Sequence, residues 1–596
     1  MKHKTIGLAL LVLTPMLLAS CGKTTSNVIT ACIASAPKTI DPATNSSVDG
    51  GTYDEHLFEG LYRWNYTGTY PNGAVSLVPG QAKDAPTKVT NTDGTVTYTY
   101  TLRDGLKWSD GTTLTANDYV RSWKRAVSKK LGSPYNYLFE ALKGGVDAEG
   151  EDDGASLAVS ATDDKTLVVT LANECSYWNE LSAFPTFAPV PATADLDGAW
   201  ASPENASTFV CNGPMKIKAF DDTKIEMVPN PNYVGTVDVK AKDIAFVFSD
   251  DDSAMLNSFE KGSYDFIDSF PSTETDTIKA NHKGEYFNVG QLGTYYYCWN
   301  VNMPSEFNTV LDTEAKRQTF RQAVCLLINR QYLIDNIAKG DQVAADGWVS
   351  VGLTEADGKT DWTADNGPKR DGAGYYDASS AGFAANETTA LGLLKSCGFT
   401  YDDATKKFTN VPSFEFVANN GDAHLKIAQV LQNELKNLGI TMTIKQQDWA
   451  IVQTIRQNGQ YTLSRNGWLC DYNDPISELD MFTTASGNND CQLGKGTNAT
   501  YAGYSVDMNA DGTIDDTEKN LTWAQSYDAL IAKVKATVDN TLRFKLMHCA
   551  EDLLMSTWCV MPIYYYTDAF LMSSKLSGFY AMPLGYKFFY GCTKAA

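Results

Sequence analysis

The sequence lacks the residue groupings that mark most catalytic and metal-binding proteins. No two of its five histidines lie within four residues of each other, which excludes a helical zinc pair. It has no Cys-x-x-Cys, no Gly-x-Ser-x-Gly and no Walker-type phosphate loop. Carboxylates are plentiful, but nothing in their spacing identifies a glycosidase pair. These absences favour a protein that is not an enzyme.

Basic residues are also scarce. There are 49 Lys and Arg against 71 Asp and Glu, a formal net charge of −22. A nucleic-acid-binding protein needs a basic face to neutralise phosphates, so nucleic acid is not expected as a partner. An acid surplus instead keeps a protein soluble at high local concentration. With 596 residues the chain is too long for one compact core, and we expect about three or four structural units.

Long apolar runs are missing after the first twenty residues. Residues 1–4 are basic and 6–19 almost wholly apolar, a segment too short to span a bilayer comfortably but typical of a signal peptide. It ends in LASCG (18–22), the arrangement of a bacterial lipobox, in which Cys21 is acylated and becomes the mature N-terminus; an ordinary cleavage site is the alternative. We expect a signal peptide over 1–20, a lipidated tether over 21–27, and a protein anchored at the outer face of the bacterial cytoplasmic membrane, in the periplasm or at the cell surface.

The cysteine count gives little guidance on disulfides. Without Cys21, eleven of the twelve cysteines remain, so at least one thiol has no partner within the chain. Export permits disulfides. The pairs to test are Cys470 with Cys491 or Cys298, and Cys175 with Cys211.

Strand and helix patterns alternate along the chain. Residues 95–103 alternate as a half-buried strand, and Thr115 begins a helix with a capping box. In the second half, strand 414–418, helix 423–438 (ended by Gly439), strand 440–444, helix 448–458 and strand 461–468 follow in β-α-β order, which predicts parallel neighbouring strands. Linkers are expected over 144–155 and 351–374, which are rich in glycine and acids.

The segment 461–475, YTLSRNGWLCDYNDP, resembles a binding site. Arg465 shares a strand face with Tyr461 and Leu463, which is costly unless that face opens into a polar cleft. Asp471 follows at the carboxyl end of the strand, where α/β sheets bind ligands. The alternative is a structural Arg–Asp ion pair at a domain edge.

Residues 507–518, DMNADGTIDDTE, match an EF-hand calcium loop. The expected ligands are the side chains of Asp507, Asn509, Asp511, Asp515 and Glu518 and the carbonyl of Thr513. There is no second hand, so a structural calcium clip is expected rather than a sensor. The alternative is an acidic surface loop. No other cofactor is expected.

Ordered blocks over nearly the whole mature chain carry a family likeness. The blocks are KTIDPAT (38–44), HLFEGLYRW (56–64), LRDGLKWSDGTTLTANDYVRSWKR (102–125), CNGPMKIKAF (211–220), NPNYV (230–234), GSYDFI (262–267), TYYYCWNV (294–301), FRQAVCLLINRQYLI (320–334), NGWLCDYNDPISELDMF (466–482) and MPIYYYTDA (561–569). Through them the chain resembles the oligopeptide-binding proteins of bacterial peptide ABC importers, the family 5 extracellular solute-binding proteins.

This resemblance implies a bilobal α/β fold of the periplasmic-binding-protein type, with two mixed α/β lobes, a hinge and an extra inserted domain. Lobe I would comprise 28–72, 203–292 and 567–596, the inserted domain 73–202, and lobe II 293–566. The lobes would close on a short peptide bound as an added strand, and the protein, a monomer, would deliver it to the permease of an ABC transporter.

The resemblance also implies roles for individual residues. Asp471 would pair with the peptide α-ammonium. Arg456, Arg465 and His424 would meet the peptide carboxylate at different ligand lengths. Aromatic groups would line or adjoin the cleft: Trp449, Trp468, Tyr135 and the run Tyr564 to Tyr566.

The chain departs from the family where a cysteine should stand beside the aspartate. Leu469 takes that place, and its partner position is Gly293, so the family's disulfide is not retained. Two alternative functions stay open: the same fold binding another solute (nickel, haem or an oligosaccharide), and a surface hydrolase.

Overall fold

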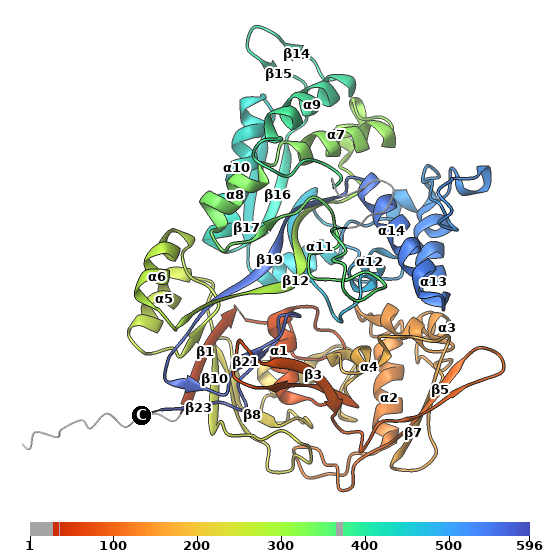
Figure 1. Cartoon of the computed structure of the whole chain (residues 1–596), viewed down its shortest axis with the longest axis vertical. Coiled ribbons are helices and arrows are strands. Elements are labelled where there is room, and N and C mark those ends of the chain that lie inside the picture. Colours follow the sequence, from red (N-terminus) through yellow and green to blue (C-terminus); the bar gives the residue numbers. More distant parts are fainter. Residues whose placement is uncertain (1–27, 35, 365–373, 596) are drawn as a thin grey trace, which may run out of the picture.

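The computed structural model describes residues 28–34, 36–364 and 374–595 as two α/β lobes that meet along one long sheet (Figure 1). The bilobal α/β fold predicted from the sequence is confirmed. The predicted signal peptide, the tether, Cys21 and part of the predicted 351–374 linker lie outside the described residues.

An eleven-stranded mixed sheet runs from one lobe into the other. Its order is β17 (Met442–Gln447), β16 (Phe414–Asn419), β18 (Leu463–Leu469), β12 (Tyr286–Trp299), β19 (Val560–Met572), β11 (Phe266–Ile267), β1 (Val28–Ala34), β10 (Asp243–Phe248), β9 (Lys224–Pro229) and β8 (Met215–Asp221), with β13 (Val343–Ala344) paired to β19.

Strands β12 and β19 connect the lobes. They pair antiparallel over most of their length, with an irregularity in register between Gly290 and Thr294. From Gly293 to Trp299, β12 also pairs with β18 of lobe II. The predicted lobe boundaries at 292/293 and 566/567 therefore fall inside these two strands. Residues 295–299 are fully buried, because their aromatic side chains pack on both faces of the sheet in lobe II.

Lobe II contains the predicted β-α-β order. β16 pairs parallel with β17 and with β18, and the crossovers are α10 (Asp422–Asn437) and α11 (Trp449–Gln457). α10 buries one stripe of Ile427, Leu431 and Leu435, and Gly439 follows it with φ +78°. The remaining elements of lobe II are α7 (Glu314–Leu326), α8 (Arg330–Leu333), α9 (Phe383–Ser396), β14 (Tyr401–Asp402), β15 (Lys407–Phe408), α12 (Ile476–Leu479), α13 (Ala529–Ala536) and α14 (Asn540–Ser556).

Lobe I is built from both ends of the chain. β1 lies between β10 and β11, parallel to both. Phe589, near the C-terminus, donates its backbone N–H to Nε2 of His56 (3.0 Å), and burial lowers the pKa of that histidine to about 4, so its ring is neutral. The other elements are α1 (Val48–Leu57), β2 (Tyr62–Thr67), α5 (Asp252–Glu260), α6 (Thr275–Asn281), β20 (Leu576–Ser577), β21 (Tyr580–Ala581), β22 (Lys587–Phe588) and β23 (Thr593–Lys594).

A separate four-stranded antiparallel sheet lies within residues 87–171. Its order is β4 (Thr87–Thr90), β5 (Val96–Thr101), β7 (Thr166–Leu171) and β6 (Val159–Ala161). α2 (Ala116–Val127) begins with the predicted capping box, in which the Thr115 N–H donates to Asp118 (2.8 Å), and buries Trp123 completely. β3 (Ala74–Pro79) pairs with β2 of lobe I across the predicted boundary at 72/73. Helix α4 (Trp178–Leu181) follows the last strand of the four-stranded sheet in sequence.

One smaller prediction was wrong, and one open question is answered. Residues 144–155 are not a plain linker: they include α3 (Gly145–Glu149), where Gly145 and Ala148 are buried. None of the cysteine pairs singled out from the sequence is a disulfide, since all five members are free thiols: Cys175, Cys211, Cys298, Cys470 and Cys491. As expected from the sequence, two other residues stand where the family has its disulfide. Gly293 lies opposite Leu469 in the β12–β18 pair.

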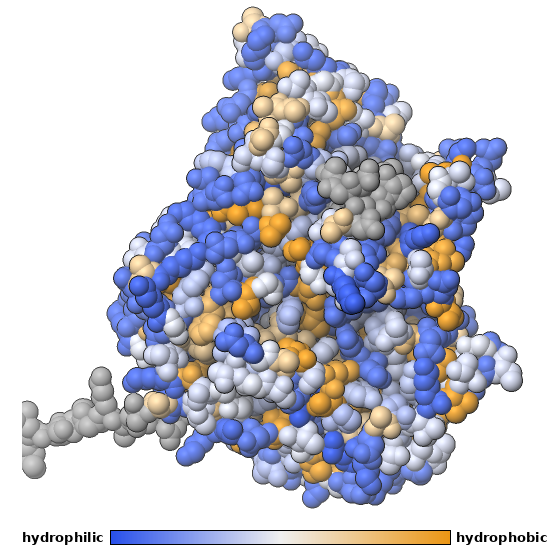
Figure 2. Space-filling view, in the orientation of Figure 1, coloured by the Kyte–Doolittle hydropathy of each residue, from blue (hydrophilic) through white to orange (hydrophobic). Residues whose placement is uncertain are grey.

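The described surface is that of a hydrophilic protein on the face shown in Figure 2, where hydrophobic residues form small scattered groups. Among the described residues, no helix has both the length and the apolar character needed to cross a membrane.

Candidate functional site

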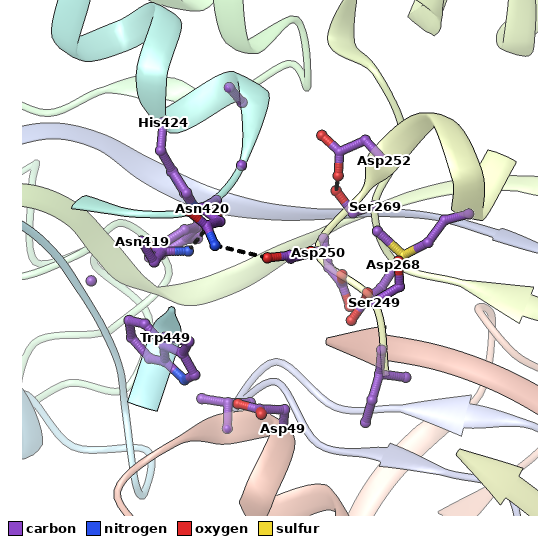
Figure 3. Close-up of a pocket in the computed structure, with 18 of the residues that line it drawn as sticks. Asp49, Ser249, Asp250, Asp252, Asp268, Ser269, Asn419, Asn420, His424 and Trp449 are labelled. Atoms are coloured by element: carbon purple, nitrogen blue, oxygen red, sulfur yellow. Dashed lines mark hydrogen bonds between the residues drawn. The ribbon is translucent and has the colours of Figure 1, made fainter. Parts of the chain in front are cut away.

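A cavity of about 430 Å³ lies between the lobes and is lined from both. It opens where strands end and helices begin: β10 is followed by α5, β16 by α10 and β17 by α11. The carboxyl ends of parallel strands are where α/β sheets bind ligands, because the chain turns away there and leaves a crevice. Figure 3 shows Asn419, Asn420, His424 and Trp449 of lobe II facing Asp49, Asp250, Asp252 and Asp268 of lobe I.

Strand β18 places every second residue on the cavity wall. Arg465, Gly467 and Leu469 line it, as the two-residue period of a strand requires. A Cβ at Gly467 would lie 2.1 Å from the Tyr566 hydroxyl, so a larger residue would disturb the wall. The expectation that Arg465 faces a polar cleft is met.

Arg465 has aromatic rather than acidic neighbours. Its guanidinium lies 5.1 Å from the ring centroid of Tyr295 and 5.5 Å from that of Trp449, and Nη2 donates to the Tyr566 hydroxyl (3.3 Å). Its Nε is buried without a hydrogen-bond partner. In the described part of the chain it forms no ion pair with a carboxylate, so the alternative of a structural Arg465–Asp471 pair is wrong. A guanidinium in this state is ready to bind an anionic group.

His424, in the first turn of α10, is a neutral member of the same wall. Burial lowers its pKa well below the ordinary value, and the charge of Arg465 lowers it further. Its Nδ1 lies 3.1 Å from the Tyr295 hydroxyl. Tyr564 stacks on Tyr295, with 4.6 Å between ring centroids, and does not line the cavity.

A smaller cavity of about 50 Å³ adjoins the first and contains Asp471. The two share Val48, Gly467 and Leu469 in their walls. Tyr135 and Trp468 line this second cavity as well.

Asp471 is a buried carboxylate without a cation. It is 7% exposed and accepts a hydrogen bond from the Tyr135 hydroxyl (3.3 Å), while its backbone N–H donates to Ser477 Oγ (2.8 Å). Burial raises the pKa of Asp471 well above its ordinary range, and the nearby Asp480 raises it further. No lysine or arginine within the described ranges forms an ion pair with it. Such a carboxylate is stabilised when a ligand supplies the cation.

Arg456 lies behind β18. Its Nε is 3.2 Å from Oδ2 of Asp490, and Nη1 donates to the Arg465 carbonyl (3.0 Å). It lines neither cavity, so it braces the strand that carries Arg465. Seven of the nine predicted binding residues thus line the two cavities: Asp471, Arg465, His424, Trp468, Trp449, Tyr135 and Tyr566. The binding role of all nine stays a prediction.

The lobe I wall was missed by sequence reasoning. Asp49 lies in the first turn of α1, Asp250 follows β10, Asp252 begins α5, Asp268 follows β11, and Lys587 lies in β22. These positions belong to separate segments and share no motif, so only the fold brings them together. Asn420 Nδ2 donates a hydrogen bond across the cleft to Asp250 (2.9 Å; Figure 3).

The EF-hand-like loop 507–518 lies away from the cleft. Asp507 accepts the N–H of Asn509 and Gly512, and Glu518 accepts those of Met508 and Asp515. Asp507 and Glu518 are buried, whereas Asn509, Asp511, Thr513 and Asp515 are exposed. Over the described ranges, no group of three or more His, Cys, Asp or Glu side chains is placed to hold a metal ion.

Comparisons with known proteins agree with this architecture. The oligopeptide-binding protein OppA of Bacillus subtilis is 29% identical over 571 residues, covering 94% of this chain and 90% of that protein. The probable deoxycholate-binding periplasmic protein YgiS of Escherichia coli is 28% identical over 91% of this chain and 89% of its own length. Among solved structures, Listeria monocytogenes OppA bound to peptide superposes with a TM-score of 0.76 at 25% identity, covering 96% of this chain and all of that one (100%).

The family model of the bacterial extracellular solute-binding proteins, family 5 (middle part), matches residues 76–490, more than half of the chain. That match contains most of the lobe II wall and part of the lobe I wall of the cleft. The chain is a member of the bacterial extracellular solute-binding proteins of family 5.

Proposed function

We propose that this protein captures short peptides between its lobes and delivers them to an ABC permease at the outer face of the bacterial cytoplasmic membrane, as a monomer that is not an enzyme. The lipobox sequence supports a lipid anchor on Cys21. The oligopeptide-binding relatives support the ligand class.

One observation carries the proposal. A carboxylate without an ion-pair partner and a guanidinium without an anion, Asp471 and Arg465, line adjoining cavities; Arg465 lies within β18 and Asp471 two residues after it. A zwitterionic peptide has the complementary ends. Six positions span at most roughly 20 Å, since β18 ends at Leu469, and this leaves room for an extended peptide of up to about four residues once the two ion-pair gaps are subtracted.

The lining also suits a peptide backbone. Asn419, Asn420 and Gln291 offer amide donors and acceptors along the wall, and Trp449 and Trp468 offer flat apolar surfaces for side chains. Family 5 recognition by added-strand hydrogen bonds would use the backbone that every peptide shares.

Isothermal titration calorimetry tests the proposal. A mixture of tri- to pentapeptides should release or absorb heat with a one-to-one stoichiometry, and native mass spectrometry of the protein as isolated should show masses of bound peptides. Absence of binding to every peptide, with binding to another solute class, would overturn it.

A second ligand class has one specific observation in its favour, the similarity to the probable deoxycholate-binding relative. A bile acid is an amphipathic monoanion, so Arg465 could meet its carboxylate, but Asp471 would then remain buried without a cation. Titration with deoxycholate in the same calorimeter separates the two ligands.

We also propose that loop 507–518 takes a calcium ion as a structural clip. The motif supports this, and Asp507 and Glu518 already lie on the inner side of the loop. Asp511 and Asp515 would have to turn inward. Millimolar calcium should raise the melting temperature of the wild type and not that of Glu518→Gln. The exposed, non-ligand substitution Asp516→Asn is the matched control. No shift in the wild type refutes the clip.

A further inference from the structure

The lobe I wall of the main cavity carries a concentration of negative charge. Asp49, Asp250, Asp252 and Asp268 come from three separate segments and face the same space (Figure 3). Asp568 of β19 also lines the cavity. The question is what balances these carboxylates.

The protein balances only part of this charge. Lys587 is the one lysine in the lining, and it is shared between Asp568 (3.2 Å) and Asp268 (3.7 Å). Arg465 is held on the opposite wall by Tyr295, Trp449 and Tyr566.

Asp49, Asp250 and Asp252 form no ion pair among the described residues, although the charge of Lys587 acts on Asp49 and that of Lys426 on Asp252. Asp252 accepts from Ser269 Oγ (2.6 Å) and Asp250 from Asn420 Nδ2 (2.9 Å), both neutral groups. Oδ2 of Asp49 is buried without any hydrogen-bond partner. An unpartnered buried carboxylate oxygen is costly unless something else supplies a donor.

A cationic group of a ligand would supply both a hydrogen-bond donor for Asp49 Oδ2 and the positive charge that this wall lacks. Burial raises the pKa of Asp49 to about 6, and hydrogen bonding with Ser47 and the charge of Lys587 offset only part of this rise. A metal ion is not favoured, because nowhere in the described ranges do three or more ligating side chains converge as a metal site. A long, flexible ammonium or guanidinium does not need convergent ligands and can bridge Asp49 and Asp252 through separate hydrogen bonds.

We propose that this wall, defined by Asp49, Asp250 and Asp252, is a specificity pocket for a lysine or arginine side chain of the bound peptide. The inference rests on the proposed peptide-binding function. The peptide's own α-ammonium belongs to Asp471 in the adjoining cavity, so the residue that enters the acidic pocket follows the first one. The cavity volume of about 430 Å³ admits both the backbone and such a side chain.

Matched peptides test this inference in the full-length protein. A series of tetrapeptides carries one lysine at position 2, 3 or 4, and each has a partner with norleucine at the same position, which keeps the carbon chain and removes the charge. Calorimetry gives the dissociation constant of each pair. At one position the lysine peptide should bind at least about 10-fold tighter than its partner.

Variants locate the effect. In the double variant Asp49→Asn with Asp252→Asn, the dissociation constants of the lysine peptide and its norleucine partner should differ by no more than about twofold. Asp403→Asn, whose side chain is 84% exposed and lies outside the cavity, should leave the ratio as in the wild type. If the double variant fails to fold, raising the salt concentration on the wild type gives the second readout, because the lysine advantage should shrink as charges are screened.

The outcomes separate the two proposals. Equal affinity for lysine and norleucine peptides at every position overturns the acidic pocket and leaves peptide binding standing. A lysine advantage that survives in the double variant also overturns it. No binding of any peptide overturns both.

Discussion

Replacing Asp471 by Asn removes one charge and little else. The amide oxygen of Asn can still accept from Tyr135, so the packing of the small cavity is preserved. In the wild type a peptide ammonium would be desolvated against a buried carboxylate. Removing one partner of such a pair costs about 2–5 kcal/mol, or about 30-fold to about 4,000-fold in the dissociation constant at ~1.4 kcal/mol per factor of ten.

The assay is calorimetric titration with a tetrapeptide and with its N-acetylated form. Acetylation removes the ammonium from the ligand, as Asp471→Asn removes the carboxylate from the protein. Each change alone should weaken binding strongly, and the two together should cost far less than the sum, since they remove the same contact. Asp403→Asn serves as a charge-matched control at an exposed position.

If Asp471→Asn binds the free peptide as tightly as the wild type, Asp471 does not bind the peptide ammonium. The same follows if the losses from the variant and from acetylation simply add. In either case the ammonium would be bound elsewhere in the cleft.

Three further predictions follow from described contacts. Arg465→Gln should weaken tetrapeptides with a free carboxylate about 10-fold or more and amidated ones little, and equal losses for both in calorimetry would contradict the carboxylate role. Peptide affinity should fall from pH 7.5 to pH 5. The raised pKa of Asp471 means that its carboxylate is protonated early on acidification, and only the ionised carboxylate pairs with the peptide ammonium. The fall should be smaller in Asp471→Asn. Glu551→Ala should lower the free energy of unfolding in urea by about 3 kcal/mol or more, since the Glu551 carboxylate accepts the N–H groups of Trp348, Val349 and the Trp362 ring (2.8–2.9 Å). Glu551→Gln should lower it less. A urea midpoint of the alanine variant equal to that of the wild type would contradict this prediction.

Local patterns predicted the parts of this fold that depend on neighbouring residues. The β-α-β order of 414–469 follows from the spacing of Ile427, Leu431 and Leu435 and from Gly439. Helix 116–127 follows from the Thr115–Asp118 box. The glycines and acids of residues 144–155 predict a linker, yet tertiary packing of Gly145 and Ala148 stabilises a short helix there.

The site was predictable on one side only. Arg465, Trp468 and Asp471 lie within seven residues of each other. The two-residue period of a strand and the resemblance of block 466–482 to the family were therefore enough to single them out. The opposite wall combines Asp49, Asp252 and Lys587, which are hundreds of residues apart. No periodicity relates them, because their proximity is set by the long-range pairing of β1, β10 and β11 and the return of the C-terminal segment.

That return of the C-terminal segment has a consequence for how the chain folds. The core of lobe I closes only when Phe589 meets His56 and β19 pairs with β11, contacts that the last residues of the chain provide. Lobe II consists of a continuous stretch apart from the end of β19, so it can assemble earlier. Synthesis from the N-terminus therefore leaves the first-made part of lobe I unfinished until residues 571–589 have been made.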